Sequence, residues 1–426
     1  MKKNLMIWLS ILLSLNVYTK TVIHAGFLID GSNDNPMNEM SIYVIDNKIT
    51  EVITGYVQPD PDDEYIDLSG YTVLPGLIDM HVHLTSNQSS PKRYLESTRL
   101  NPADYAIRSV NNAKMTLLAG FTTVRNLGDS DAVTVSLRNE ISNGTVLGPR
   151  IFTAGKAIGT TGGHADPTNG WKKNIAGNPG PSEGVINGTD DARKAVRQRY
   201  KNGADVIKIT ATGGVMSIAK NGQNPQFTIE EIKAICETAK DYDMIVAAHA
   251  HGDEGIQRAV MGGVNTIEHG TLLSEKSMEL MKQYGTYYVP TITAGKEVAA
   301  KAKIPGYYDE LVVPKALAIG PKIQSTTSKA YNAGVNIAFG SDAGVFPHGE
   351  NAKEFRYMNE AGIPVIECLQ AATIVNSKIL SMESEIGQIK KGFIADIVAT
   401  KINPIDDITS LENVQFVMKE GKIYKN

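Results

Sequence analysis

The chain has 426 residues, of which 42% are hydrophobic and 21% are charged, and its formal net charge is −4. This composition is typical of a globular protein that buries a large core. Acidic and basic residues are spread along the sequence without forming a basic stripe, which argues against a nucleic-acid partner.

The N-terminus differs in composition from the rest of the chain. Lys2 and Lys3 precede an apolar run from Leu5 to Val17, which is the pattern of a secretory signal. The run is short for a membrane span, and no later segment reaches the required length. We therefore expect a signal peptide at residues 1–19 and a periplasmic or secreted protein, with no stable membrane span after cleavage. The alternative is an uncleaved N-terminal anchor.

Both ends of the remaining chain read as short strands. Residues 20–75 alternate apolar and polar side chains between turns, and Asp46 to Lys48 predicts a tight hairpin turn. Residues 383–426 show the same pattern, with a turn at Glu420 and Gly421. We expect the two segments to pair into one small β-sandwich beside the middle of the chain.

Residues 76–382 alternate between strand-like and helix-like patterns. Several helical stretches end in glycine, for example Gly263 and Gly334, where a helix terminus often needs a left-handed residue. Alternating β and α units predict a parallel sheet, and eight such units suit a closed (β/α)₈ barrel, so the fold class is α/β. The eight expected strands lie within residues 76–84, 120–128, 149–159, 204–214, 244–252, 264–271, 286–293 and 335–344.

Histidines and one aspartate gather at the ends of these expected strands, on the face where barrel enzymes carry their active sites. His81 and His83 are two residues apart on the first strand, so their side chains point to the same side. His249, His269 and Asp342 end the fifth, sixth and eighth strands. Imidazole and carboxylate groups are ligands that suit zinc or a similar divalent ion.

Lys208 lies in the middle of the fourth expected strand, between two isoleucines. An amine that points into a barrel is costly unless its charge is neutralised or paired, and burial lowers its pKa. A neutral amine can take up carbon dioxide to form a carbamate, whose two oxygens can bridge two metals. The alternatives are an ion pair with a nearby acid such as Asp205, or a side chain that reaches the rim.

Taken together, these residues resemble the binuclear amidohydrolase superfamily. The segments PGLIDMHVHL, IEHGT and GSDAG each match a familiar local form of that superfamily, and the resemblance covers nearly the whole chain after the signal. The segments TTGGHADP and KITATGGVMS resemble its imidazolonepropionase-related branch, and within it the Xaa-Pro-type dipeptidases. The residues that carry the resemblance are His81, His83, Lys208, His249, His269 and Asp342.

The resemblance implies two divalent metal ions, expected to be zinc, and a hydroxide as nucleophile. It implies that Asp342 accepts the proton of this nucleophile and passes it to the leaving nitrogen. His164, on the loop after the third strand, is placed to stabilise the developing oxyanion, although it could instead close a turn at Gly162 and Gly163. In this arrangement His81, His83 and Asp342 hold the more buried ion, His249 and His269 hold the other, and carboxylated Lys208 bridges them.

The expected substrate is a small molecule, most simply a dipeptide with proline or an apolar residue at its C-terminus. Arg125 is a candidate for its carboxylate, or alternatively a structural arginine of the barrel. Tyr288 could place a hydroxyl in the pocket, and Phe227 would favour an apolar or prolyl leaving residue. His348 could contact the substrate or lie on a surface loop.

Two alternatives to an exported dipeptidase follow from the same residues. The chain could hydrolyse a cyclic amide, a lactone or a carbamate. It could also be a non-catalytic binding protein on the same fold, although such proteins usually lack some of the ligands, and none is missing here. A homo-oligomer is expected.

Overall fold

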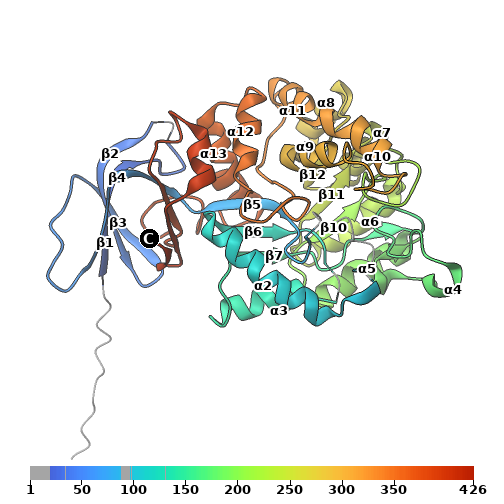
Figure 1. The fold of residues 1–426 in the computed structure, drawn as a ribbon, viewed down its shortest axis with the longest axis horizontal. Coiled ribbons are helices and arrows are strands. Elements are labelled where there is room, and N and C mark those ends of the chain that lie inside the picture. Colours follow the sequence, from blue (N-terminus) through green and yellow to red (C-terminus); the bar gives the residue numbers. More distant parts are fainter. Residues whose placement is uncertain (1–19, 34, 88–95, 97, 130) are drawn as a thin grey trace, which may run out of the picture.

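The computed structural model describes residues 20–33, 35–87, 96, 98–129 and 131–426 (Figure 1). The expected signal peptide at residues 1–19 lies outside the described residues and stays a prediction. Within the described part of the chain, no helix combines the length and the apolar character that crossing a bilayer requires. Figure 1 shows a small strand-rich unit beside a larger unit of strands and helices.

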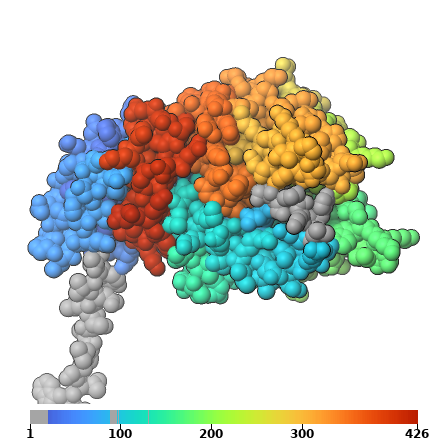
Figure 2. All heavy atoms as spheres, in the orientation of Figure 1, coloured from blue at the N-terminus to red at the C-terminus, as the bar shows by residue number. Residues whose placement is uncertain are grey.

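The small unit is one seven-stranded sheet built from both ends of the chain, with strand order β16-β15-β14-β4-β1-β2-β3. β4 pairs antiparallel with β14, where Pro75 faces Ile397. Figure 2 shows the two ends of the described chain, in blue and red, side by side. The two segments therefore pair as predicted, within one sheet, and the β-sandwich stays a prediction. The strands are β1 (Lys20–Leu28), β2 (Met37–Ile45), β3 (Lys48–Thr54), β4 (Glu64–Pro75), β14 (Ile397–Thr400), β15 (Phe416–Lys419) and β16 (Lys422–Lys425).

Apolar side chains hold this sheet together. The buried residues on β1, β2 and β4, such as Ile23, Ile42 and Val73, pack in the same core as Ile397 and Phe416 from the C-terminal strands. The predicted turn between β2 and β3 is also present, since Asp46 adopts a left-handed φ of 54°. The alternating pattern of the sequence thus marks both the buried face and the hairpin.

The larger unit contains two parallel sheets, in the orders β5-β6-β7 and β10-β11-β12-β13. Their residues are almost all buried, as expected for parallel strands that helices cover on one side. The strands are β5 (Leu77–Val82), β6 (Phe121–Asn126), β7 (Arg150–Thr153), β10 (Ile207–Thr210), β11 (Val246–Ala250), β12 (Thr266–His269) and β13 (Tyr287–Val289), and a two-stranded sheet adds β8 (Gly159–Thr160) and β9 (Val185–Ile186).

Helices alternate with these strands and surround them in Figure 1. α6 shows why they begin where they do: the Thr228 hydroxyl accepts a hydrogen bond from Glu231 N (3.2 Å), and the Glu231 carboxylate accepts one from Thr228 N (2.9 Å). Gly263 and Gly334 have φ of 97° and 78°, as predicted. The helices are α2 (Pro102–Leu118), α3 (Val133–Ser142), α4 (Lys173–Ala176), α5 (Thr189–Lys201), α6 (Ile229–Lys240), α7 (Asp253–Gly262), α8 (Glu275–Tyr284), α9 (Ile292–Lys301), α10 (Val313–Ile319), α11 (Ile323–Asn332), α12 (Lys353–Glu360), α13 (Val365–Gln370) and α14 (Asn376–Ile379), with short helical turns η1 (Pro181–Glu183), η2 (Gly320–Lys322), η3 (Ala371–Val375) and η4 (Ile408–Asn413).

Backbone hydrogen bonds link the two parallel sheets to each other. Ile158, just after β7, forms a parallel bridge with Ile209 of β10. On the other side, Ile337 bridges to Tyr288 of β13, and Ala343 bridges to Val82 of β5. The sheets are thus connected at both edges, as a closed barrel requires.

The eighth expected strand differs from the sequence prediction. Residues 335–344 contain isolated bridges and no regular strand. The reason is local backbone geometry, since Asp342 and Gly344 have φ of 61° and 111°, outside the β region. The segment still follows β5, because Met80 N donates to Phe339 O (3.1 Å) and Asp342 N to His81 O (2.7 Å).

A buried ion pair fastens the small sheet to the larger unit. The Arg150 guanidinium, on β7, donates to Asp396 Oδ2 (2.8 Å) and to Glu420 Oε1 (2.7 Å), both in the C-terminal segment. Asp396 is 3% exposed, so its charge has little contact with water. Removing the cation leaves a buried carboxylate without its partner.

We expect Arg150→Met to lower the free energy of unfolding by about 3 kcal/mol, because Asp396 then loses its charged partner. Urea denaturation measures the change. Arg193→Met is the matched control, since Arg193 pairs with Glu237 at the surface, where side chains are 39% and 65% exposed, and a change below about 0.5 kcal/mol is expected. Equal effects of the two substitutions would contradict a fastening role for Arg150.

Candidate active site

A cavity of about 590 Å³ opens where the C-terminal ends of the parallel strands meet. His81 at the end of β5 lines it, together with Lys208 of β10, His249 of β11, His269 of β12 and Asp342. Five segments that are far apart in sequence therefore contribute to one cavity. The structure brings together all six residues that the sequence suggested as metal ligands, His83 being the sixth.

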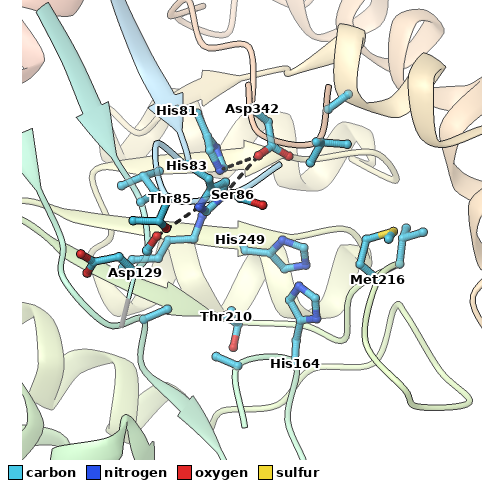
Figure 3. Close-up of a pocket in the computed structure, with 18 of the residues that line it drawn as sticks. His81, His83, Thr85, Ser86, Asp129, His164, Thr210, Met216, His249 and Asp342 are labelled. Atoms are coloured by element: carbon cyan, nitrogen blue, oxygen red, sulfur yellow. Dashed lines mark hydrogen bonds and ion pairs between the residues drawn. The ribbon is translucent and has the colours of Figure 1, made fainter. Parts of the chain in front are cut away.

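His81, His83 and Asp342 form the tightest group in the cavity (Figure 3). One potential ligand atom from each lies within 4.8 Å of the others. Asp342 Oδ1 is 3.5 Å from His81 Nε2 and 3.3 Å from His83 Nε2. These separations are long for hydrogen bonds but suit three atoms that surround a common cation.

The opposite nitrogen of His81 is fixed by a buried acid. His81 Nδ1 lies 2.8 Å from Glu268 Oε2, and Arg125 Nη2 donates to Glu268 Oε1 at 2.7 Å. Burial alone raises the pKa of Glu268, but Arg125 and His81 outweigh it and lower this pKa to about 2. Burial and the nearby Lys208 lower the pKa of His81 to about 4. His81 is therefore neutral at pH 7 and directs its Nε2 lone pair into the cavity.

His249 and His269 lie beside this group, with ring centroids 4.7 Å apart. Burial and the neighbouring histidines hold both pKa values well below the usual range, so both rings are neutral. Thr291 Oγ1 is 2.7 Å from His269 Nδ1 and orients that ring. His251 lies on the same side and is held in the same way, by Thr271 Oγ1 at 3.0 Å.

Lys208 is 4% exposed, and its Nζ has no hydrogen-bond partner among the described residues. The alternative of a pair with Asp205 is wrong, because Asp205 Oδ2 accepts a hydrogen bond from Arg138 Nη1 at 2.6 Å. Burial lowers the pKa of Lys208 to about 8. Asp342 Oδ1 and Thr210 Oγ1 are likewise buried without a hydrogen-bond partner in the described chain. Such orphaned groups in one cavity fit a site for bound cations and a modified lysine.

Backbone strain is concentrated at the same place. His269, Thr291 and Asp342 have φ of 70°, 53° and 61°, a region that non-glycine residues rarely adopt. Each such residue costs roughly 1 kcal/mol or more, and clusters of them are typical of functional sites. The surrounding contacts must therefore hold these three residues in place.

His164 lies over the same group, on the loop that follows β8. Its ring centroid is 4.5 Å from that of His249, and the ring occupies space that only a glycine at position 214 leaves, since a Cβ there would lie 2.2 Å from His164 Cε1. The turn at Gly163 is closed by the backbone, as Gly163 N donates to Thr160 O at 2.8 Å. The His164 ring is thus directed into the cavity rather than needed for the turn.

Two of the expected substrate contacts are buried beside the cavity instead of lining it. Arg125 is fully buried and donates to Glu268 and to Met80 O (2.7 Å), so the structural alternative is the correct one. Tyr288 is fully buried, and its hydroxyl donates to His269 O at 2.8 Å. Both side chains support the ligand strands and have no surface left for a substrate.

Phe227 and His348 also lie away from the described lining of the cavity. Phe227 is 2% exposed and packs in the core between strands and helices. His348 is 1% exposed, with Nε2 3.2 Å from His83 O, so it is neither a surface residue nor a substrate contact. Both residues follow an expected strand, but that position does not determine the direction in which their side chains point.

The sequence reasoning missed a buried acid that shapes the site. Asp79 is fully buried and accepts hydrogen bonds from His81 N (3.0 Å), Ser341 N (3.0 Å) and Asn351 Nδ2 (2.8 Å). It ties β5 to the irregular segment that carries Asp342. The available signal was its spacing, since an acid two residues before His81 on an apolar strand points to the same side.

One side of the cavity is an apolar wall, which the sequence also did not reveal. α9 and η2 approach closely there, because a Cβ on Gly320 would lie 2.5 Å from Gly295 O. The wall offers contact area to an apolar side chain but no hydrogen-bonding side chains. Its residues are Val215, Met216, Ala294, Gly295, Val298, Ala316, Ile319, Gly320, Ile323 and Val345.

Comparison with known proteins assigns the family. Residues 72–424 match the amidohydrolase family. The chain belongs to this family. A curated relative, the ochratoxinase of Aspergillus niger, is 30% identical in an alignment that covers 95% of this chain and 86% of that protein.

Solved structures extend the likeness over nearly the whole chain. A Xaa-Pro dipeptidase with bound methionine in its active site is 51% identical, has a TM-score of 0.93, and covers 96% of this chain and 100% of its own. A prolidase complexed with N-methylphosphonate-L-proline is 33% identical, with a TM-score of 0.86 and the same coverage. The resemblance to the amidohydrolase superfamily and its prolidase-like members is confirmed.

We expect Thr291→Val to weaken metal binding by about 10-fold, because His269 loses the hydroxyl that orients its ring. Thr271→Val is the matched control, since it removes the same contact from His251, which is not an expected ligand. Competition titration with a zinc chelator measures both. An unchanged affinity in Thr291→Val, or an equal loss in Thr271→Val, would contradict the ligand assignment of His269.

Proposed function

We propose that this amidohydrolase is an exported, binuclear metal-dependent dipeptidase that cleaves the amide bond before a C-terminal proline or apolar residue. The observation that carries the proposal is the group of His81, His83 and Asp342 around one point, with Lys208 beside it, whose amine has no hydrogen-bond partner among the described residues. The family match and the similarity to a Xaa-Pro dipeptidase and a prolidase support the reaction class.

The linked parallel sheets form one closed (β/α)₈ barrel in this proposal, with residues 335–344 as its irregular eighth strand. Neutral imidazoles and a carboxylate suit zinc. When bound, two such ions supply a hydroxide at neutral pH, because they lower the pKa of water. One ion would be held by His81, His83 and Asp342 and the other by His249 and His269, with carboxylated Lys208 between them.

The burial of Lys208 supports its proposed modification. A neutral amine adds to the carbon of carbon dioxide, and the nitrogen loses one proton as the carbamate anion forms. The new group would replace an orphaned amine with two oxygens that share one negative charge, beside the residues that would hold the cations. This removes the cost of leaving Lys208 Nζ buried without a partner.

The protein's own groups would then move one proton through the hydrolysis. The hydroxide oxygen would form a bond to the carbonyl carbon while its one proton passes to Asp342. The imidazole of His164 donates a hydrogen bond to the carbonyl oxygen as negative charge develops there. Asp342 then gives the proton to the amide nitrogen as the carbon–nitrogen bond breaks.

The apolar wall supports the proposed substrate class. An apolar side chain that leaves water for this wall gains about 25 cal/mol per Å² of buried area. Small residues at positions 294, 295, 316 and 320 leave the room that a proline or methionine side chain occupies. The wall replaces Phe227 as the physical reason for an apolar preference.

Export and oligomeric state are parts of the proposal that rest on the sequence. Residues 1–19 carry the signal pattern described above. N-terminal sequencing of the protein from its native compartment tests the cleavage, and light scattering on the purified protein tests the homo-oligomer. A retained N-terminus would indicate the anchor alternative.

We expect the wild-type protein to bind about two zinc ions per chain and to hydrolyse Xaa-Pro or Xaa-apolar dipeptides, and Lys208→Ala to lose both properties. Metal analysis and a dipeptide panel measure them. Lys419→Met is the matched control, since Lys419 is also buried but lies in the small sheet.

Each outcome assigns a different function. Two metals without dipeptide cleavage would direct the search to cyclic amides, lactones and carbamates, which the same panel should include. A protein that binds no metal and stays inactive with zinc and bicarbonate would contradict the enzyme proposal and favour a binding protein.

We expect Ala294→Leu to raise the KM for a dipeptide with C-terminal methionine about 10-fold and to change the KM for one with C-terminal alanine little, because the added side chain fills the apolar wall. Ala300→Leu, at an exposed position of the same helix, is the control. Equal effects of Ala294→Leu on both substrates would contradict the role of the wall.

A further inference from the structure

The described lining of the cavity contains three cationic side chains besides the histidines: Arg108, Lys156 and Lys208. Arg108 Nη1 is already paired with Glu96 Oε2 at 2.7 Å. Lys208 lies among the expected metal ligands. Lys156 makes no ion pair and no side-chain hydrogen bond within the described residues. Among the described residues that line the cavity, Lys156 is therefore the cation that is available to bind a ligand.

The backbone holds Lys156 next to the strand that carries Lys208. Two residues after Lys156, Ile158 N donates to Lys208 O at 2.8 Å, and Thr210 N donates to Ile158 O at 3.0 Å. On the other side, Gly155 N donates to Thr153 Oγ1 at 3.0 Å. Both flanks of Lys156 are thus fixed to the barrel, so the side chain begins at a defined position beside the reaction centre.

Arg199 is a second cation next to Lys156, and it is more deeply buried. Arg199 of α5 is 2% exposed and donates from Nε to Lys156 O at 2.6 Å and from Nη1 to Ser182 O at 3.2 Å. Within the described chain its hydrogen bonds go to the backbone carbonyls of Lys156, Ser182 and Pro181, and no carboxylate forms a direct ion pair with it. Burial and then Arg199 lower the pKa of Lys156. An anion that binds Lys156 also relieves the repulsion between these two cations.

The nearby carboxylates of the described chain do not form an ion pair with Lys156. Asp129 lines the same cavity, where its Oδ2 accepts hydrogen bonds from Thr134 N (2.5 Å) and Thr134 Oγ1 (2.8 Å) at the start of α3. Its Oδ1 is buried without a hydrogen-bond partner in the described chain, so Asp129 forms no hydrogen bond with Lys156 there. Asp131 is exposed to solvent, where its charge is screened. Both raise the pKa of Lys156 less than burial and Arg199 lower it.

We propose that Lys156 binds the free α-carboxylate of the substrate's C-terminal residue, which makes it a specificity-determining residue. This inference rests on the proposed amide hydrolysis and adds the requirement for a free C-terminus. In a dipeptide the carboxylate carbon is three bonds from the scissile carbonyl carbon, so its partner must lie close to the metal ligands. Lys156 lines the same cavity as these residues, and Ile158, two residues further on, is hydrogen-bonded to Lys208 of β10.

The test compares a dipeptide that ends in methionine with its C-terminal amide. The wild-type kcat/KM should be about 10- to 100-fold higher for the free acid, as expected for a hydrogen bond between charged groups. Lys156→Met should bring the two values together, mainly by raising the KM of the acid, and Lys156→Arg should keep part of the preference. Lys173→Met, an exposed lysine on α4, should behave like wild type.

A binding measurement separates this inference from the proposed function. Calorimetry of the zinc-loaded protein should show that Lys156→Met weakens binding of L-methionine about 10-fold and leaves L-methioninamide unchanged. This binding result supports the role of Lys156 even if the protein cleaves no dipeptide. The absence of cleavage would contradict only the dipeptidase proposal. Equal affinities of wild type and Lys156→Met for L-methionine, or a wild-type enzyme that cleaves acid and amide equally, would overturn the inference.

Discussion

The site depends on one buried ion pair, between Arg125 of β6 and Glu268 of β12. Both side chains are fully buried, so water compensates neither charge, and the pair is stable only because hydrogen bonds satisfy the remaining polar atoms. Arg125 also donates to Met80 O, and Glu268 holds His81 Nδ1. The pair thereby joins three strands across the interior and fixes the ring that faces the cavity. A change at either residue would alter the site without touching a ligand atom.

Two further buried acids hold strained backbone segments at the cavity in place. Asp79 holds the segment that carries Asp342, and Glu354 of α12 accepts hydrogen bonds from Ile292 N (2.7 Å) and Thr293 N (2.8 Å) at the start of α9. Thr291, which orients His269, directly precedes that helix. Asp342 and Thr291, two of the left-handed residues of the site, are thus each next to a backbone segment whose N–H groups bond to a buried carboxylate. Strain is tolerated here because the surroundings over-determine the conformation.

The sequence predicted most of the strands and the gathering of the candidate ligand residues in one place, because both follow simple rules. Alternation on β5 places His81 and His83 on one side, and parallel strands bring their C-terminal ends together. The irregular eighth segment was not predictable, because contacts from Asp79 and Asn351 set its geometry. The prediction of Tyr288 as a substrate contact was wrong for a related reason. Its side chain points inward as alternation requires, yet its hydroxyl donates a hydrogen bond to the carbonyl of His269. The apolar wall depends on the contact of Gly295 with Gly320, which no local pattern encodes.

The pairing of β4 with β14 also has a consequence for how the chain reaches this fold. The partners Pro75 and Ile397 are joined only when nearly the entire polypeptide has been synthesised. Until then β4 presents an unpaired edge, and open strand edges invite association with other chains. Contacts of such sequence separation form slowly. The small sheet is therefore the last part of the molecule to close, and the interval before closure is when the chain most needs a chaperone.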